Sequence, residues 1–114
     1  MKKTPLHEAH NEMFRRYNAL MQEDSLGENK LHSSIRYRLM LMSVHAISNV
    51  MPIDKIGRWL GFIQGNLYAC ELINLEEERE FSRKIFHKAY EDMGIEVPKS
   101  IDVVQANFES MTDV

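Results

Sequence analysis

The clearest helical pattern in the sequence is Lys55-Ile56-Gly57-Arg58-Trp59-Leu60-Gly61-Phe62-Ile63-Gln64-Gly65-Asn66-Leu67-Tyr68-Ala69. Apolar side chains recur in it every three or four residues, at Ile56, Leu60, Ile63 and Leu67, and Cys70 extends the series. This spacing is typical of an α-helix that buries one face. The sequence therefore predicts a helix from Asp54 to Leu72 with one side in a hydrophobic core.

A second pattern overlies the first. Gly57, Gly61, Gly65 and Ala69 recur every fourth residue, so one narrow strip of this helix has almost no side chain. Each glycine inside a helix costs roughly 1 kcal/mol relative to alanine, and the close approach of another helix could offset that cost. The approaching helix could belong to the same chain or to a second copy in a symmetric contact.

Three aromatic residues flank this strip and would suit an interface, although aromatics at helical spacing are more often part of a core. The predicted oligomer interface therefore consists of Gly57, Trp59, Gly61, Phe62, Gly65 and Tyr68. The expected assembly is a homo-oligomer, in its simplest form a dimer.

Two helices are predicted before this stretch. Thr4 followed by Pro5 favours a helix start, because the threonine oxygen can cap free amides and proline suits the first position. That helix is expected to run to about Met21, and the composition of residues 23–30 predicts a loop. Residues 31–50 predict a second helix, which is apolar around most of its circumference from Leu39 onward and is therefore expected to be central.

A fourth helix is predicted after the stretch. Asn74 with Glu77 three residues later is typical of a helix start, and Gly94 predicts the end of that helix. Its expected buried stripe is Phe81, Ile85, Ala89 and Met93.

The predicted fold class is therefore all-α: a compact bundle of about four helices. With 114 residues the chain can bury one core. Residues 1–98 are assigned to the bundle domain and residues 99–114 to an acidic C-terminal tail. A short helix in the tail could start at a Ser100 cap and place Ile101, Val104, Phe108 and Met111 on one side.

Charge and composition exclude several classes of function. The net charge is −3; residues 1–90 carry 13 basic against 11 acidic side chains and residues 91–114 carry one against six. An acidic chain is a poor candidate for binding nucleic acid, which requires clustered Lys and Arg. The longest uncharged run, residues 39–53, is too short for a membrane span. The single cysteine and the polar N-terminal residues, which lack the apolar stretch of a signal peptide, predict a cytoplasmic protein.

No pattern of residues predicts catalysis, a metal or a cofactor. The five histidines form neither H-E-x-x-H nor Glu-x-x-His. The acidic run at residues 76–80 is similar to the acidic helices of all-α nucleotide pyrophosphohydrolases, which hold magnesium with carboxylates from two helices. A second acidic helix is missing here, and acidic residues in a first turn are also explained by the helix dipole.

Three arginines are the predicted contacts for an acidic partner or ligand. Arg36 and Arg38 stand at the polar beginning of the second helix, and Arg58 lies on the glycine-bearing helix. Solvation of these charges is the ordinary alternative.

The residues Lys55-Ile56-Gly57-Arg58-Trp59-Leu60-Gly61-Phe62-Ile63-Gln64-Gly65, with Glu76-Glu77-Glu78-Arg79 and Ile85-Phe86-His87, resemble small proteins encoded by tailed bacteriophages. The resemblance covers roughly half the chain and brings no functional residue with it. It implies a context, because many short phage proteins bind and block a host protein, including components of antiviral defence such as restriction, BREX-like or CRISPR systems.

The predicted function is thus a non-enzymatic phage-type protein that binds and inhibits a host protein in the host cytoplasm. One alternative is an oligomeric protein that sequesters a small nucleotide between subunits, using Arg36, Arg38 or Arg58. The other is a magnesium-dependent all-α nucleotide pyrophosphohydrolase that uses the acidic helix.

Overall fold

The first helix begins where its own side chains can cap it. In the computed structural model, which describes residues 2–97 and 109–111, α1 spans Pro5–Leu26. Thr4 Oγ1 accepts a hydrogen bond from the His7 amide (3.3 Å), and His7 Nδ1 accepts one from the Thr4 amide (3.2 Å). This reciprocal arrangement is a capping box. The predicted start at Thr4 and Pro5 is confirmed.

The end of α1 lies at Leu26 and not near Met21, so the predicted loop starts too early. The reason is Asp24, whose buried carboxylate accepts hydrogen bonds from the backbone amides of Lys30 (2.7 Å) and Leu31 (2.9 Å). Because these bonds draw the connection back against the helix, one more helical turn is ordered before the chain reverses.

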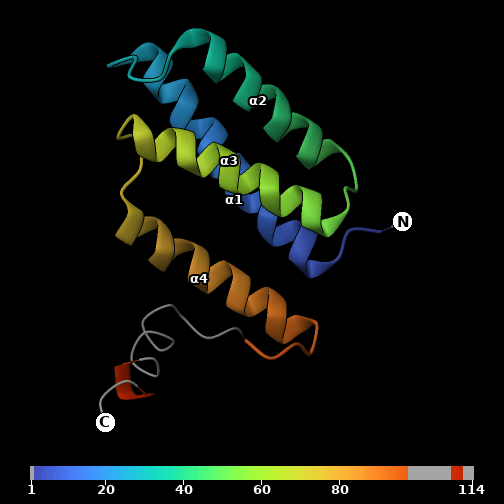
Figure 1. Ribbon diagram of the computed structural model, residues 1–114. Coiled ribbons are helices and arrows are strands. Elements are labelled where there is room, and N and C mark those ends of the chain that lie inside the picture. The colour runs from blue at the N-terminus through green and yellow to red at the C-terminus, as the bar shows by residue number, and fades with distance from the viewer. Residues whose placement is uncertain (1, 98–108, 112–114) are drawn as a thin grey trace.

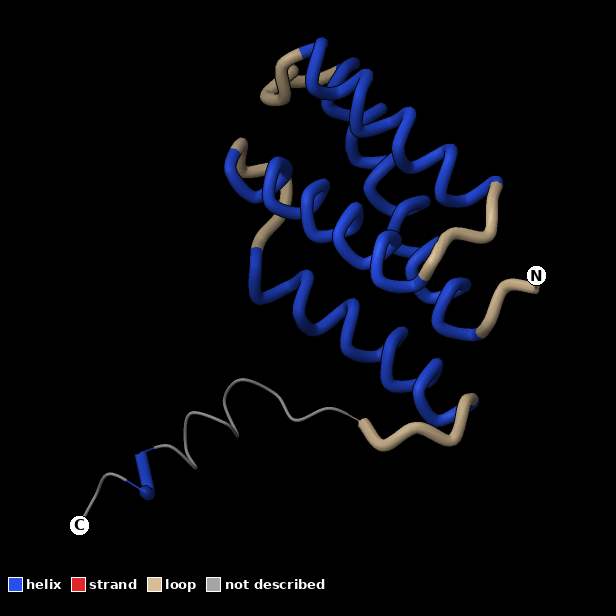
Figure 2. The backbone as a smooth tube through the Cα atoms, turned by 45° about the vertical axis from the view of Figure 1, so that its right-hand side comes forward, coloured by secondary structure: helices blue, strands red, loops and turns tan. Residues whose placement is uncertain are grey.

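The other three helices are α2 (Ser33–Ser48), α3 (Ile53–Ala69) and α4 (Leu75–Asp92). They run side by side, with short connections at either end of the bundle (Figures 1 and 2). α3 ends at Ala69, before the predicted Leu72, because Glu71 takes a left-handed conformation (φ 64°) and turns the chain. The predicted Asn74 cap of α4 is confirmed, because Asn74 Oδ1 accepts a hydrogen bond from the Glu77 amide. The predicted end of α4 is confirmed by Gly94, which has a φ of 68°.

The central helix is α1, which packs against α2, α3 and α4. The prediction that the second helix is central is wrong. α2 rests on α1 through Arg36, Leu39, Ser43 and Ala46, touches α3 over a shorter stretch, and leaves its opposite side exposed.

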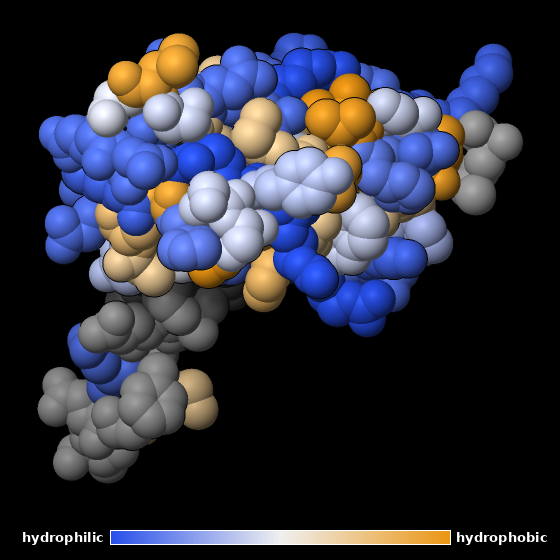
Figure 3. Space-filling model, turned by 90° about the horizontal axis from the view of Figure 1, so that it is seen from above, coloured by the Kyte–Doolittle hydropathy of each residue, from blue (hydrophilic) through white to orange (hydrophobic). Residues whose placement is uncertain are grey.

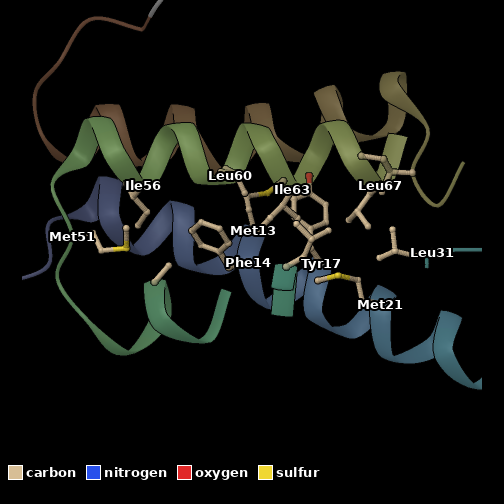
Figure 4. Packing of buried hydrophobic residues seen from close by; sticks show 13 residues of the cluster. Met13, Phe14, Tyr17, Met21, Leu31, Met51, Ile56, Leu60, Ile63 and Leu67 are labelled. Carbon is tan, nitrogen blue, oxygen red and sulfur yellow. The ribbon is translucent and has the colours of Figure 1, made fainter. Parts of the chain in front are cut away.

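The core lies mainly between α1 and α3. Ile56, Leu60, Ile63 and Leu67 of α3 point towards Met13, Phe14, Tyr17 and Met21 of α1, and Leu31 and Met51 close the two ends (Figure 4). The buried stripe predicted for α3 is therefore confirmed. Removing water from these side chains is the main favourable term for such a fold.

The buried stripe predicted for α4 is only partly correct. Ala89 is buried and Ile85 is half-buried, but Phe81 and Met93 are exposed at the edge of the contact. Glu78 occupies the buried position instead. Its burial turns α4 so that Phe81 lies beside the guanidinium of Arg16, 4.1 Å from the ring centre.

The all-α prediction is confirmed: the described residues form helices and no strand. Residues 109–111 make one exposed helical turn, whereas Ser100, Ile101, Val104 and Phe108 of the predicted tail helix lie outside the described residues. In the part of the chain that the structure describes, no helix combines the length and the apolar character needed to cross a membrane.

Candidate interaction surface

Two glycines of α3 face away from the other described helices. A β-carbon added to Gly61 or Gly65 would find no neighbouring atom within 4 Å, and both residues are exposed. At Gly57 the same atom would lie 3.8 Å from Nε2 of His10 on α1, which is ordinary contact. Of the two alternatives, coverage of the strip by another helix of the same chain is therefore wrong at Gly61 and Gly65 for the helices that the structure describes. A contact with a second copy stays a prediction.

Two aromatic side chains flank the uncovered glycines. Phe62 is 51% exposed and Tyr68 is 54% exposed. We call the surface formed by Gly61, Phe62, Gly65 and Tyr68 the α3 open face. The glycines make this surface a smooth ridge of backbone, and the aromatic side chains beside it are apolar groups that a partner could cover.

Trp59, which was predicted to belong to the same interface, is directed towards α2. Its ring is half-buried, 5.7 Å from the ring of His45, and the ammonium group of Lys55 lies 5.3 Å from its centre. Trp59 thus links α2 and α3 and packs against the edge of the core. The spacing of residues in α3 indicates that Trp59 lies beside the glycine strip, but it does not show which flank of α3 meets α2.

The three predicted arginine contacts are not brought together. Arg36 is buried, and its Nη2 donates to Asp24 Oδ2 (3.0 Å), Asn29 Oδ1 (2.6 Å) and the Leu31 carbonyl oxygen (2.6 Å). The prediction of Arg36 as a partner or ligand contact is therefore corrected: its guanidinium holds the α1–α2 connection.

Arg38 and Arg58 are both exposed but lie at opposite ends of an antiparallel helix pair, near the beginnings of α2 and α3 (Figure 1). Arg58 pairs with Asp54 at 4.0 Å, and both side chains are largely exposed. Such a pair contributes little to stability, so Arg58 stays accessible on the outer side of α3.

A buried polar network that the sequence did not indicate joins α1, α3 and α4. Glu78 accepts hydrogen bonds from Arg16 Nη2 (2.7 Å) and from the Tyr17 hydroxyl (2.8 Å), and that hydroxyl accepts one from Gln64 Nε2 (2.9 Å). Burial raises the pKa of Tyr17, and the hydrogen bond to Glu78 raises the pKa of Arg16. These hydrogen bonds and the ion pair between Arg16 and Glu78 fix the position of α4 on α1.

This network uses one carboxylate of the acidic run. The carboxylate of Glu78 is hydrogen-bonded to Arg16 and Tyr17. The side chains of Glu76, Glu77 and Glu80 are exposed at the start of α4. Among residues 2–97 and 109–111, no three His, Cys, Asp or Glu side chains are grouped so that they could hold a metal ion. A helical periodicity that counts Glu78 with Ser82, Ile85 and Ala89 would have found the buried glutamate.

The two neighbouring histidines of α1 are parts of the scaffold. His7 Nε2 lies 2.7 Å from the Met51 carbonyl oxygen, which ties α1 to the α2–α3 connection. His10 lies edge-on to Phe86 with ring centres 4.9 Å apart, and its Nδ1 is 2.8 Å from the Leu6 carbonyl oxygen. Burial lowers the pKa of His10 more than this hydrogen bond raises it.

A second exposed apolar surface lies on α2. Tyr37 is 67% exposed, and Leu41 and Val44 are each 53% exposed. A shallow depression beside them is lined by Ser34, Ile35, Tyr37, Arg38, Leu41 and Met42. The sequence predicted a central helix that is apolar around most of its circumference from Leu39 onward, so it did not identify this exposed surface.

No protein-family model, curated protein or solved structure matches this chain. The geometry offers two apolar surfaces on neighbouring helices, and the ionisable groups that the fold buries are engaged in its own scaffold.

Proposed function

We propose that this chain is a protein-binding domain that acts through the α3 open face and without catalysis. One observation carries the proposal: Gly61 and Gly65 are exposed inside a helix, and no atom of the described residues lies within 4 Å of the space that their side chains would fill. The two glycines cost the isolated helix roughly 1–2 kcal/mol in total. A partner that lies against the bare backbone would offset this cost.

The chemistry of the α3 open face suits a protein partner. Phe62 and Tyr68 stand on either side of the glycine ridge and are half exposed. Aromatic residues of this kind are enriched among the residues that contribute most to binding at protein interfaces. Arg58 on the outer side of α3 adds a charged group at the rim, where such groups influence specificity and association rate more than affinity.

The resemblance to small bacteriophage proteins makes a host protein the proposed partner, including a component of antiviral defence. Inhibition would then be steric, because the rigid surface of α3 would cover a site on that host protein. Residues 91–114, with six acidic side chains against one basic, would add charge complementarity to a basic patch on it.

The two alternatives receive less support. A nucleotide-sequestering site built from Arg36, Arg38 and Arg58 would need them close together, but Arg36 is engaged with Asp24 and the other two lie far apart along the helix pair. A magnesium site on the acidic helix would have to do without Glu78. No specific observation therefore favours either alternative over the protein-binding proposal.

Affinity capture from cells that express the chain tests the proposal. The wild type should retain a defined host protein, and Phe62→Asp and Gly65→Leu should lose it. Leu26→Asp is the matched control, because it places a carboxylate at an apolar side chain that is 91% exposed at the end of α1. Equal retention by the wild type and by both α3 variants, all shown to be folded by circular dichroism, would contradict the proposal.

A further inference from the structure

The outward side of α2 carries a regular seam of residues. Ser34, Tyr37, Leu41, Val44 and Ser48 follow one another at intervals of three, four, three and four residues, and all five are exposed. We call this surface the α2 seam. Alternating steps of three and four keep one face of a helix in contact with another helix that crosses it at a shallow angle. The shape of the α2 seam therefore fits a helix as its occupant.

No described helix of this chain supplies that occupant. α2 contacts α1 through the opposite side, where Leu39, Ser43 and Ala46 are buried. α3 meets α2 along one flank, through the contact between His45 and Trp59. α4 lies on the far side of α3 from α2 (Figures 1 and 2).

The lack of charge on the α2 seam favours a second copy of this chain as its occupant. In α2 the only Lys, Arg, Asp or Glu side chains are Arg36 and Arg38, and Arg36 is buried against Asp24. The α2 seam itself is uncharged. The exposed sides of α1 and α4, in contrast, carry several charges each, among them Glu8, Glu12 and Lys84. A symmetric dimer places a surface against itself, so it requires a surface without strong charge of one sign, and the α2 seam meets this requirement.

We propose that two copies of this chain associate through their α2 seams, with the two helices antiparallel about an axis at Leu41. In that register Leu41 meets its counterpart in the second copy. Tyr37 of each copy lies opposite Val44 of the other, so a large side chain faces a small one, and Ser34 lies opposite Ser48, where two hydroxyls can exchange a hydrogen bond. The antiparallel arrangement also opposes the two helix dipoles favourably.

The dimer is small. Its apolar part consists of three side chains from each copy. Hydrophobic residues form scattered patches among hydrophilic ones on the face of the molecule seen in Figure 3. Contacts of this size belong to the weak, transient class of interfaces, so the dissociation constant should be on the order of micromolar. The dimer uses no residue of the α3 open face and does not depend on the function proposed above. It presents two such faces to a partner, which would add avidity.

Sedimentation equilibrium of the purified chain over a wide concentration range tests the dimer. The mass of the wild type should rise from 13.4 kDa towards twice that value. Leu41→Asp should stay at the monomer mass, with at least a tenfold weaker association. Leu26→Asp and Phe62→Asp should associate like the wild type, because neither changes the α2 seam.

A second measurement keeps the test independent of any loss of folding. Leu41→Cys in a Cys70→Ser background should be joined by a short bis-maleimide into a covalent dimer, whereas Leu26→Cys in the same background should not. A wild type that stays monomeric throughout the range overturns the proposal. So does an association that Leu41→Asp leaves intact, or one that Phe62→Asp abolishes instead. Host capture with Phe62→Asp tests the α3 open face separately, so failure of one proposal is distinguishable from failure of the other.

Discussion

Replacing Gly61 and Gly65 by alanine should make the isolated domain more stable. Both residues lie inside α3, and the β-carbon that each alanine adds would meet nothing within 4 Å. No steric cost therefore opposes the gain in helix propensity. A glycine-to-alanine change in an exposed helix interior contributes roughly 0.5–1 kcal/mol, so the double variant should gain about 1–2 kcal/mol in its free energy of unfolding.

Urea denaturation followed by circular dichroism measures this gain, and thermal melting should show it as a rise in Tm on the order of 5–10 °C for a domain of this size. Both experiments should be run at low protein concentration, so that self-association does not contribute. Gly94→Ala is the control in the opposite direction. Gly94 has φ 68° at the end of α4, so a side chain there is strained and should cost about 1 kcal/mol.

A lower free energy of unfolding in Gly61→Ala or Gly65→Ala would refute the reasoning. It would mean that something does lie against the strip in the free protein. The same double variant separates stability from function: it should be more stable than the wild type and yet bind its partner more weakly, because the added methyl groups hold the partner away from the α3 backbone.

Three further predictions concern hydrogen bonds made by side chains. Asp24→Asn should lower the free energy of unfolding by about 3 kcal/mol at pH 7, because it leaves the guanidinium of Arg36 without its carboxylate. Burial raises the pKa of Asp24, but the hydrogen bonds from backbone amides and from Arg36 outweigh this effect, so the pKa is lowered overall. The difference in free energy of unfolding between the wild type and Asp24→Asn should therefore shrink below about pH 4, as the wild-type carboxyl protonates. Urea titrations at several pH values measure this difference. Tyr17→Phe should cost about 1–2 kcal/mol in the same assay, because it removes a hydroxyl that donates to Glu78, and an unchanged midpoint would argue against that bond. Thr4→Ala should cost about 1 kcal/mol by loss of the α1 cap, and no change in Tm would contradict the capping box.

Local chemistry made much of the fold predictable. The caps at Thr4 and Asn74 and the stop at Gly94 act within a few residues, so the sequence contains all that determines them. The spacing of Ile56, Leu60, Ile63 and Leu67 likewise defines one face of α3 without reference to the other helices.

The errors concern which partner a helix face meets. α2 is apolar on nearly every side, and nothing local says that the side with Leu41 is left exposed while the side with Leu39 is buried. Glu78 is buried in place of Phe81 because Arg16 and Tyr17, some sixty positions earlier, can pair with its carboxylate. Such pairings depend on tertiary packing, which the residue pattern of a single helix cannot predict.

The glycine strip shows the same division. Its spacing is evident in the sequence, and it correctly identifies a surface of α3 without side chains. Whether this surface faces the chain's own core or lies open is decided by the direction of the neighbouring stripe at Ile56 and Leu60, which turns Gly61 and Gly65 outward.

Photo-crosslinking in cells shows most directly whether a partner protein occupies the α3 open face. A photoreactive phenylalanine at position 62 preserves the aromatic ring, and the same group at position 26 serves as the control. Irradiation should join the chain to a distinct host protein from position 62 and not from position 26. If position 62 gives no product beyond those formed from position 26, no protein covers the α3 open face and the proposed function is wrong.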